Sequence, residues 1–408
     1  MSGRDILFFW DTRMMMAGLE LAGDVPFKTL VLHGIVRDSQ GRKLSKSLNN
    51  SPDPLALFDQ FGTDAVRISI AQNYPLGRQD ARLSDELFRN GQGFVIKLWN
   101  ATKLILGNLS GGCELDSANL KLEALEDRWI VSRLGEAIKN HDAYLEKSDF
   151  SHALGVVTSF FWDDFCDWYL EILKPRLWGE GEAKSSALGV SLLCLRNIYK
   201  LFHLYMPFVT EELWQTLRAH GVADAATAKD DERSIALSSW PVRELFAKDA
   251  EAEAQIDIMA SIVRGVRDVR QNLGISPKQA LDTKLVFLND VTKTRFEPVR
   301  GITQALGGVH GFAQHVGEAT PAGYVPYKFS GGIGYVELPS DIDARDISTK
   351  LTARIEKLQK ALQGIERNLG NKDFVANAPA ALVEETKGKA AELKESISKL
   401  DDFRHSLQ

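Results

Sequence analysis

The chain has 408 residues, of which 44% are hydrophobic and 25% charged, and its net charge is −6. This length predicts two to four globular domains, and the absence of a long apolar run or a secretory leader predicts a cytoplasmic protein with no membrane span. The negative net charge excludes a generally basic surface, so any contact with nucleic acid must come from local basic patches. Three widely spaced cysteines form no disulfide framework or zinc motif; they predict buried reduced thiols and no metal site.

The first 36 residues predict a strand–helix–strand unit. Residues 6–10 suit a buried strand or a strand-to-helix junction, residues 13–19 suit a helix that Gly23 and Pro26 end, and residues 30–36 suit a second strand. This order favours a parallel, doubly wound sheet of the Rossmann type, with more strands expected before Met1. A small two-strand domain is the alternative.

A polar loop with the sequence GRKLSKS follows the second strand at residues 41–47. Lys43 and Lys46 provide two mobile positive charges, and Ser45 and Ser47 provide two hydroxyls, which suits a polyphosphate ligand. Such lysines can also stabilise the charge that gathers on leaving pyrophosphate. A solvated loop without a ligand is the alternative.

The flanks of this loop resemble the signature loop of class I aminoacyl-tRNA synthetases, which reads KMSKS and binds ATP. The resemblance rests on His33-Gly34, the loop itself, Asn50, and Asp53-Pro54. It implies that Lys43 and Lys46 are catalytic and hold the triphosphate, that Ser45 and Ser47 order the loop, and that His33 and Gly34 lie by the nucleotide. It also implies ATP with Mg²⁺. Leu44 replaces the usual Met, and Asn49 stands where the family has Gly; Asn tolerates the left-handed backbone that such a turn needs.

The segment before the loop is similar to valyl-tRNA synthetases. Residues 4–10 read RDILFFW, and in this family the Trp that matches Trp10 walls the amino-acid pocket. A flat indole narrows a pocket so that a branched side chain of valine size fits. A Trp that only packs in the core is the alternative. Asp11 departs from the family, and we expect its carboxylate to face solvent or the missing half.

Residues 51–125 predict a helical connector, with helices near 54–58, 64–70 and 84–100. Arg78, Asp80 and Arg82 form a polar loop within it, either solvated or in contact with a partner.

Residues 126–278 predict an antiparallel helix bundle. Residues 164–171 (DFCDWYLE) and 206–214 (MPFVTEELW) resemble the anticodon-binding domain of the same subclass. Ser151 and Thr210 are the expected N-caps of two helices, and the carboxylates of residues 164–171 are expected to pair with Lys174 and Arg176 rather than act as acids or bases. Arg264, Arg267 and Arg270 recur every third residue. They predict a stripe that contacts tRNA phosphates, with a solvated face as the alternative.

Two further segments follow. Residues 279–340 predict a small α/β module with a strand at 283–288 and a hairpin that turns at 330–332. Residues 341–408 predict an antiparallel coiled-coil hairpin, because apolar residues alternate at spacings of four and three. Phe374-Val375 and Asn377-Ala378-Pro379 resemble the C-terminal tRNA-binding arm of valyl-tRNA synthetases; a dimerisation arm is the alternative.

The complete prediction is a mainly α chain with an α/β start. Its segments are the C-terminal part of a Rossmann-type catalytic domain (1–50), a connector (51–125), an anticodon-binding domain (126–278), an α/β module (279–340) and a coiled-coil arm (341–408). The resemblance implies the C-terminal portion of a valine–tRNA ligase, whose partners are tRNA(Val), valine, ATP and the missing N-terminal catalytic half. The HxGH motif and the editing domain of the family are not found. The alternatives are a non-catalytic tRNA-binding subunit or paralogue, and an isoleucyl-tRNA synthetase portion.

Overall fold

The computed structural model describes residues 1–38, 40–73, 80–109, 113–115, 122–224, 233–243, 246–316, 324–337, 344–370, and short helical pieces between 386 and 404. The chain divides into two compact units, Met1–Glu253 and Ala254–Gln408. Across the described ranges, no helix has the length and apolarity needed to cross a membrane.

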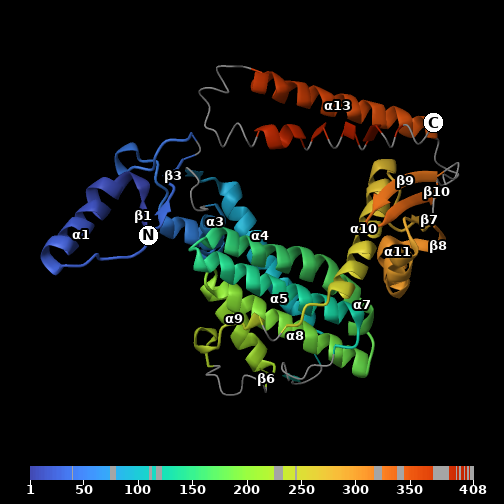
Figure 1. Ribbon diagram of the computed structural model, residues 1–408, viewed down its shortest axis with the longest axis horizontal. Helices are drawn as coiled ribbons and strands as arrows, with labels where there is room; N and C mark the ends of the chain where they lie inside the picture. The colour runs from blue at the N-terminus through green and yellow to red at the C-terminus, as the bar shows by residue number, and fades with distance from the viewer. Residues whose placement is uncertain are drawn as a thin grey trace. The chain divides into compact units, whose positions relative to one another are not determined.

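The N-terminal segment contains a parallel strand pair joined by a helical crossover (Figure 1). Strand β1 (Ser2–Gly3) pairs with β2 (Leu32–His33), and between them a 3₁₀ turn (Arg4–Ile6), a π turn (Leu7–Asp11), helix α1 (Thr12–Ala17) and a second π turn (Gly18–Ala22) follow in order. The strand alternative for residues 6–10 is therefore wrong. Gly23, at φ 73°, ends the helical stretch as predicted, since Gly adopts the left-handed backbone that stops a helix at the lowest steric cost.

The burial predicted for residues 6–10 is also wrong for this chain. Phe8, Phe9 and Trp10 are 79%, 69% and 59% exposed. These side chains lie on the outward face of the crossover, where no other described element covers them. Asp11, by contrast, is only 2% exposed, so its carboxylate does not face solvent.

The second predicted strand is broken at Gly34-Ile35. After β2, the chain resumes as β3 (Val36–Arg37), which pairs in parallel with β4 (Ala81–Arg82) in the connector. The lysine loop, defined as residues 43–47, leaves the end of β3.

The connector is helical, as predicted. Helix α2 (Pro54–Phe61) is capped by Asp53, α3 (Thr63–Asn73) follows, and α4 (Asp85–Leu106) is capped by Ser84. Its core joins residues from all three helices: Phe61, Ala65, Val66 and Phe88. This core fixes the base of the lysine loop, because residue 52 and helix α2 follow the loop directly.

The helix bundle consists of α5 (Leu125–Glu146), α6 (Phe150–Ser159), a π-helical stretch (Phe160–Tyr169), α7 (Leu170–Leu177), α8 (Glu182–His203) and α9 (Pro207–Ala219). Figure 1 shows α4, α5 and α8 running alongside one another, and α8 contacts both α4 and α5. A 3₁₀ turn (Ile235–Leu237) and a parallel pair of β5 (Cys113–Leu115) with β6 (Val222–Asp224) lie at its edge.

Large buried side chains fill the bundle, among them Phe161, Phe165, Tyr199, Phe202 and Trp214. Burial of this much aromatic and aliphatic surface is the main force that holds the helices together. Cys166 and Cys194 are free thiols within this core, which confirms the prediction for these two cysteines, and burial raises the pKa of the Cys166 thiol to about 12.

Both predicted N-caps in the bundle are wrong. Asp149 caps α6 by accepting the backbone N–H of His152, and Ser151 instead donates to the carbonyl of Gln72. Helix α9 begins at Pro207, and Thr210 is buried inside its first turn. Asp149 thus starts α6, and Pro207, which has no N–H group to satisfy, starts α9, so both helices begin before the predicted cap.

Helix α10 (Ala250–Leu273) begins in the last residues of the first unit, and in the second unit it precedes a four-stranded sheet of order β8-β7-β10-β9. Strand β7 (Leu281–Phe287) pairs in parallel with β8 (Val309–Val316) and antiparallel with β10 (Gly332–Glu337), which forms the predicted hairpin with β9 (Tyr324–Phe329). Helix α11 (Asp290–Phe296), a 3₁₀ turn (Glu297–Val299) and α12 (Arg300–Gly307) make the crossover from β7 to β8. The sequence analysis missed β8 and both helices.

The arm begins with α13 (Ala344–Gly370), and the described residues between 386 and 404 are helical. Leu351 and Ile355 of α13, and Ala390 and Leu400 of the return segment, are buried at the predicted spacing. A 2.8 Å ion pair between Glu366 and Lys394 joins the two segments. Residues 374–379, which carry part of the resemblance to the arm, lie outside the described residues.

Candidate functional site

The lysine loop leaves β3 through a tight reversal. The backbone N–H of Asp38 donates to Arg42 O at 2.9 Å, and the N–H of Leu44 donates to Val36 O at 3.3 Å, so the chain turns back alongside the strand. Gly41 sits at φ 79° inside the turn. A left-handed residue there is readily provided by Gly, which explains the glycine immediately before Arg42.

The side chain of Asn50 closes the loop from behind. Its Oδ1 accepts the backbone N–H of Ser45 at 2.8 Å, and its Nδ2 donates to Lys43 O at 3.2 Å and to Asp38 Oδ2 at 2.9 Å. Asn49 precedes it at φ 47°, the left-handed backbone that was predicted for this position. The amide of Asn50 thus ties the beginning and the middle of the loop to the end of β3.

The two serines contact each other. Ser45 Oγ and Ser47 Oγ lie 2.6 Å apart, and the backbone N–H of Ser47 donates to Ser45 Oγ at 3.2 Å, where a short 3₁₀ turn (Lys46–Leu48) begins. These bonds link the two serines to each other within the loop.

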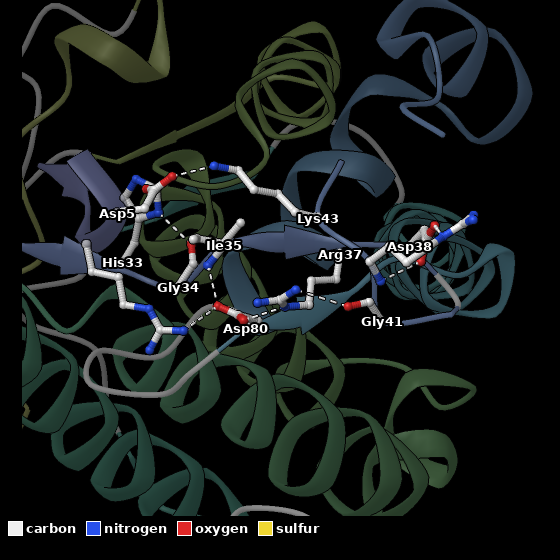
Figure 2. Close-up of polar contacts among 11 residues, drawn as sticks. Asp5, His33, Gly34, Ile35, Arg37, Asp38, Gly41, Lys43 and Asp80 are labelled. Atoms are coloured by element: carbon white, nitrogen blue, oxygen red, sulfur yellow. Dashed lines mark hydrogen bonds and ion pairs between the residues drawn. The ribbon is translucent and has the colours of Figure 1, made fainter. Parts of the chain in front are cut away.

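Lys43 forms an ion pair with Asp5, and this contact lowers the pKa of the Asp5 carboxyl (Figure 2). Both side chains remain partly open to solvent, so the pair is weakly bound and the ammonium group can exchange Asp5 for another anion. His33 lies on the same side, with its Nδ1 2.8 Å from Gly34 O. The structure therefore brings His33, Gly34 and Lys43 to one surface, while the side chain of Lys46 lies outside the described residues.

Asp80 joins three parts of the site (Figure 2). Its carboxylate accepts Arg4 Nη2 at 2.9 Å, Arg37 Nε at 2.5 Å and the backbone N–H of Ile35 at 3.0 Å. Burial raises its pKa, but the Ile35 N–H and the two guanidinium groups outweigh that effect, and the pKa is lowered. Asp80 is therefore not solvated, which corrects one alternative for the polar loop at 78–82; Arg78 lies outside the described residues.

Trp10 lies on the exposed crossover, 59% open to solvent. It does not pack in a core within this chain, so the alternative of a purely structural Trp is not what the structure shows. The neighbouring Asp11 is buried, and its Oδ2 has no hydrogen-bond partner among the described residues.

The three arginines of α10 do not form one stripe. Arg264 and Arg267 are exposed, but Arg270 is only 6% exposed. Its guanidinium group donates to the carbonyls of Gln279 at 2.6 Å, Gly308 at 2.7 Å and Ser276 at 3.0 Å. Arg270 holds the end of α10 against the start of β7 and β8, so it is not available to a phosphate group.

The bundle carboxylates have structural partners. Glu171 pairs with Lys174 at 2.6 Å, as predicted, whereas Asp164 pairs with Arg133 at 2.9 Å. Arg176 instead pairs with Glu126 and Asp127 of α5. No group of three His, Cys, Asp or Glu side chains suited to a metal ion occurs within the described ranges.

Sequence reasoning missed Asp5 and Asp38, and it named Asp80 only as part of a polar loop in the connector, without linking it to this site. Asp38 lies in the turn after a strand, a place where an Asp commonly binds nearby backbone N–H groups, and this signal could have identified it. Asp5 and Asp80 are 38 and 37 residues away from Lys43, so nothing local in the sequence connects them to the loop.

Three family models match successive parts of the chain. "tRNA synthetases class I (I, L, M and V)" matches residues 1–84, "Anticodon-binding domain of tRNA ligase" matches residues 127–285, and "Valyl tRNA synthetase tRNA binding arm" matches residues 341–408. The last match covers the segment that the sequence predicted to be an arm.

Curated relatives match the whole chain. It is 36% identical to a valine–tRNA ligase of Thermotoga maritima, with all of this chain and 44% of that protein covered. It is 33% identical to that of Nitratidesulfovibrio vulgaris (100% and 45% covered) and 32% identical to that of Bacillus subtilis (98% and 44% covered). The chain spans less than half the length of these relatives.

Proposed function

We propose that this chain, which belongs to the class I tRNA synthetases and is related along its whole length to valine–tRNA ligases, is the portion of such an enzyme that holds ATP and tRNA(Val). The complete enzyme would activate valine with ATP to valyl-adenylate and then transfer valine to the 3′-terminal ribose of the tRNA. The observation that carries the proposal is the ordered lysine loop beside His33 and Gly34, in a chain whose relatives are valine–tRNA ligases.

In the proposed first step, a carboxylate oxygen of valine attacks the α-phosphorus of ATP, and the bond from this phosphorus to the β-phosphate oxygen breaks. Negative charge gathers on the leaving pyrophosphate. Lys43 and Lys46 hold the triphosphate and stabilise this charge, while the serines and Asn50 keep the loop backbone in place. Mg²⁺ enters with ATP as part of the substrate.

The exposed apolar face of the crossover supports a partner for this segment. Phe8, Phe9 and Trp10 lie close together in sequence with Met16, Leu19 and Leu21, which are 66%, 55% and 84% exposed. Apolar side chains gathered in this way mark an interaction surface. We propose that the remainder of the catalytic domain, which the relatives' greater length provides, covers this face and completes the valine pocket with Trp10.

The tRNA would bind to the anticodon-binding bundle and the arm. Arg264 and Arg267 are exposed on α10 and are the proposed phosphate contacts; Arg270 is withdrawn from this set because it is buried. The acidic net charge makes such local basic groups necessary for RNA binding.

Valine-dependent ATP–pyrophosphate exchange tests the proposal. In the complete enzyme, Lys46→Ala should slow adenylate formation by roughly 10²–10³-fold with little change in valine binding, because one preorganised partner of the developing charge is lost. A rate within a few-fold of the wild type would show that the loop does not bind ATP. Isoleucine-dependent exchange in place of valine-dependent exchange would identify the isoleucine alternative.

The 408-residue chain by itself should give no exchange, because it lacks the HxGH half of the nucleotide site and cannot align the reacting groups. Exchange by the purified chain at ordinary enzyme rates would contradict this. Absence of exchange also from the complete gene product, together with tRNA binding, would favour the non-catalytic subunit.

A further inference from the structure

Asn50 and Asp38 lie behind the lysine loop, and neither is among the proposed contacts with ATP. Asn50 uses both atoms of its amide: Oδ1 accepts the N–H of Ser45, and Nδ2 donates to Lys43 O and Asp38 Oδ2. A single side chain thus spans the segment between the first lysine and the first serine.

Asp38 fixes the orientation of that amide. Its Oδ1 accepts the backbone N–H groups of Gln40 at 3.0 Å and Arg42 at 2.8 Å, and its Oδ2 accepts Arg42 Nε at 2.8 Å as well as Asn50 Nδ2. If the amide of Asn50 turned over, its Oδ1 would face this carboxylate and its Nδ2 would face the N–H of Ser45, and both contacts would be repulsive. These bonds also lower the pKa of the Asp38 carboxyl to about 2, so its charge is present throughout the physiological range.

Leu44 borders a pocket of about 140 Å³ that is open to solvent, and Leu57, Leu83 and Phe88 form part of its lining. Asp38 and Asn50 border the same pocket. A side chain that borders an open pocket makes fewer dispersion contacts than one packed on all sides, so the polar bonds of Asn50 contribute more to where the loop backbone lies.

We propose that Asn50, oriented by Asp38, is the positioning residue that sets the backbone of Lys43 and Ser45 for the triphosphate. This rests on the proposed ATP-binding role of the loop. Without the Asn50 bonds, the lysine side chains should shift from their positions around the triphosphate. A misplacement on the order of 1 Å lowers the reaction rate by about 10²-fold.

The test compares Asn50→Ala and Asp38→Asn with Lys46→Ala and wild type in the complete enzyme. Asn50→Ala and Asp38→Asn should each lower kcat for valine-dependent pyrophosphate exchange by roughly 10–100-fold, while the KM for valine and the affinity for tRNA stay within two-fold. Asn73→Ala is the matched control, because the amide of Asn73 donates to Ser69 O in its own helix α3, away from the loop. The control should exchange at the wild-type rate.

A rescue variant separates positioning from general destabilisation. Asp38→Asn combined with Asn50→Asp places a carboxylate where it accepts the N–H of Ser45 and an amide where it donates to that carboxylate. This double variant should catalyse pyrophosphate exchange at least five-fold faster than Asn50→Asp alone, in which two carboxylates face each other.

Hydrogen exchange of the 408-residue chain measures the loop itself. The backbone amide of Ser45 should exchange its hydrogen with solvent at least ten-fold faster in Asn50→Ala than in wild type.

The outcomes distinguish the two proposals. A wild-type kcat for Asn50→Ala and Asp38→Asn, with a slow Lys46→Ala, overturns the positioning role and leaves the ATP loop in place. A wild-type rate for Lys46→Ala overturns both. Equal losses of kcat and tRNA affinity, without rescue by the double variant, would show that Asn50 only stabilises the fold and would also overturn the inference.

Discussion

The carboxylate of Asp64 in helix α3 accepts the backbone N–H of Val209 at 2.6 Å, at the first turn of helix α9. Three residues along α3, Arg67 Nε donates to Tyr205 O at 3.0 Å, just beyond the end of α8. One connector helix therefore satisfies main-chain groups on both sides of the turn between α8 and α9. A negative group at the start of one helix and a positive group at the end of another both match the helix dipoles. These contacts fix the connector, and with it the base of the lysine loop, to the bundle.

We expect Asp64→Ala to lower the free energy of unfolding by about 1–2 kcal/mol, the usual cost of removing a helix cap. Asp64→Asn should cost less, because its amide oxygen can still accept the Val209 N–H. Urea unfolding monitored by Trp fluorescence measures both changes, and Asp59→Ala on the exposed face of α2 is the control. Equal stability of wild type and Asp64→Ala would contradict the role of this cap.

The pKa values of the Asp64 and Asp38 carboxyl groups should be shifted in opposite directions. Burial raises the pKa of Asp64 above its usual 3.8, against the opposing effects of the Val209 N–H and Arg67, whereas the Asn50 and Arg42 contacts lower the pKa of Asp38 to about 2. A raised pKa means that the folded state binds the proton more tightly, so Asp64 contributes stability at low pH that is lost as the pH rises through its folded pKa. A lowered pKa means that Asp38 contributes stability above about pH 3.8 that is lost as the pH falls toward 2.

Carboxyl chemical shifts followed by NMR test this contrast. We expect the Asp38 midpoint near pH 2 and the Asp64 midpoint above 3.8. In Asn50→Ala, the Asp38 midpoint should rise toward its usual value, because Asn50 provides the largest single contribution to the shift. Two midpoints that coincide near 3.8 would refute both environments.

The sequence predicted the helices of the connector and bundle well, because helical periodicity is a local property that depends on burial of one face. The sequence-based prediction failed where contacts between residues far apart in the chain determine the structure. Strand β8 is paired with β7 after a crossover of two short helices, and no local pattern in 290–316 shows this pairing. Helices α6 and α9 begin earlier than predicted, because Asp149 can cap the first and Pro207 can start the second.

The sequence predicted the part of the site whose residues lie in one continuous stretch. The lysine loop and its serines are such a stretch, but Asp80 reaches Arg4 and Arg37 across 76 and 43 residues. Arg270 was misplaced for a geometric reason. Three residues advance a helix by about 300°, so a residue six positions after Arg264 lies about 120° away from it around the axis, which is far enough to enter the core.

This difference between the arginines gives a stability prediction. Arg270→Ala leaves the carbonyls of Gln279 and Gly308 without their donor, and it should lower the free energy of unfolding of the second unit by about 2–4 kcal/mol. Arg267→Ala, on the exposed side of the same helix, removes a solvent-exposed bond to Leu306 O at 3.3 Å, and should lower it by only about 1 kcal/mol or less. Thermal unfolding of the two variants in parallel measures the difference; equal effects would contradict the assigned role of Arg270.

The exposed pair should instead affect tRNA binding. If Arg264 and Arg267 contact phosphates, Arg264→Gln with Arg267→Gln should weaken binding of valine tRNA by the 408-residue chain and lower the slope of log K against log salt by up to about 1.8, or roughly 0.9 for each phosphate. Filter binding at several salt concentrations gives this slope. An unchanged slope would assign these arginines to a solvated face.

Removal of the arm, residues 341–408, should weaken tRNA binding while the bundle stays folded. Within the arm, Leu351 and Ile355 of α13 and Ala390 and Leu400 of the return segment are all buried, and Glu366 pairs with Lys394 across the two segments. Helices that bury their apolar residues against each other do not need the bundle for that purpose. The truncated chain should therefore keep the unfolding midpoint of the bundle, where Trp214 is buried and reports through its fluorescence. Binding of valine tRNA at low salt should fall by at least about ten-fold, the effect of roughly 1.4 kcal/mol in binding free energy. Full affinity without the arm would remove its proposed role in binding RNA, and a dimer that becomes a monomer on truncation would identify it as a dimerisation arm.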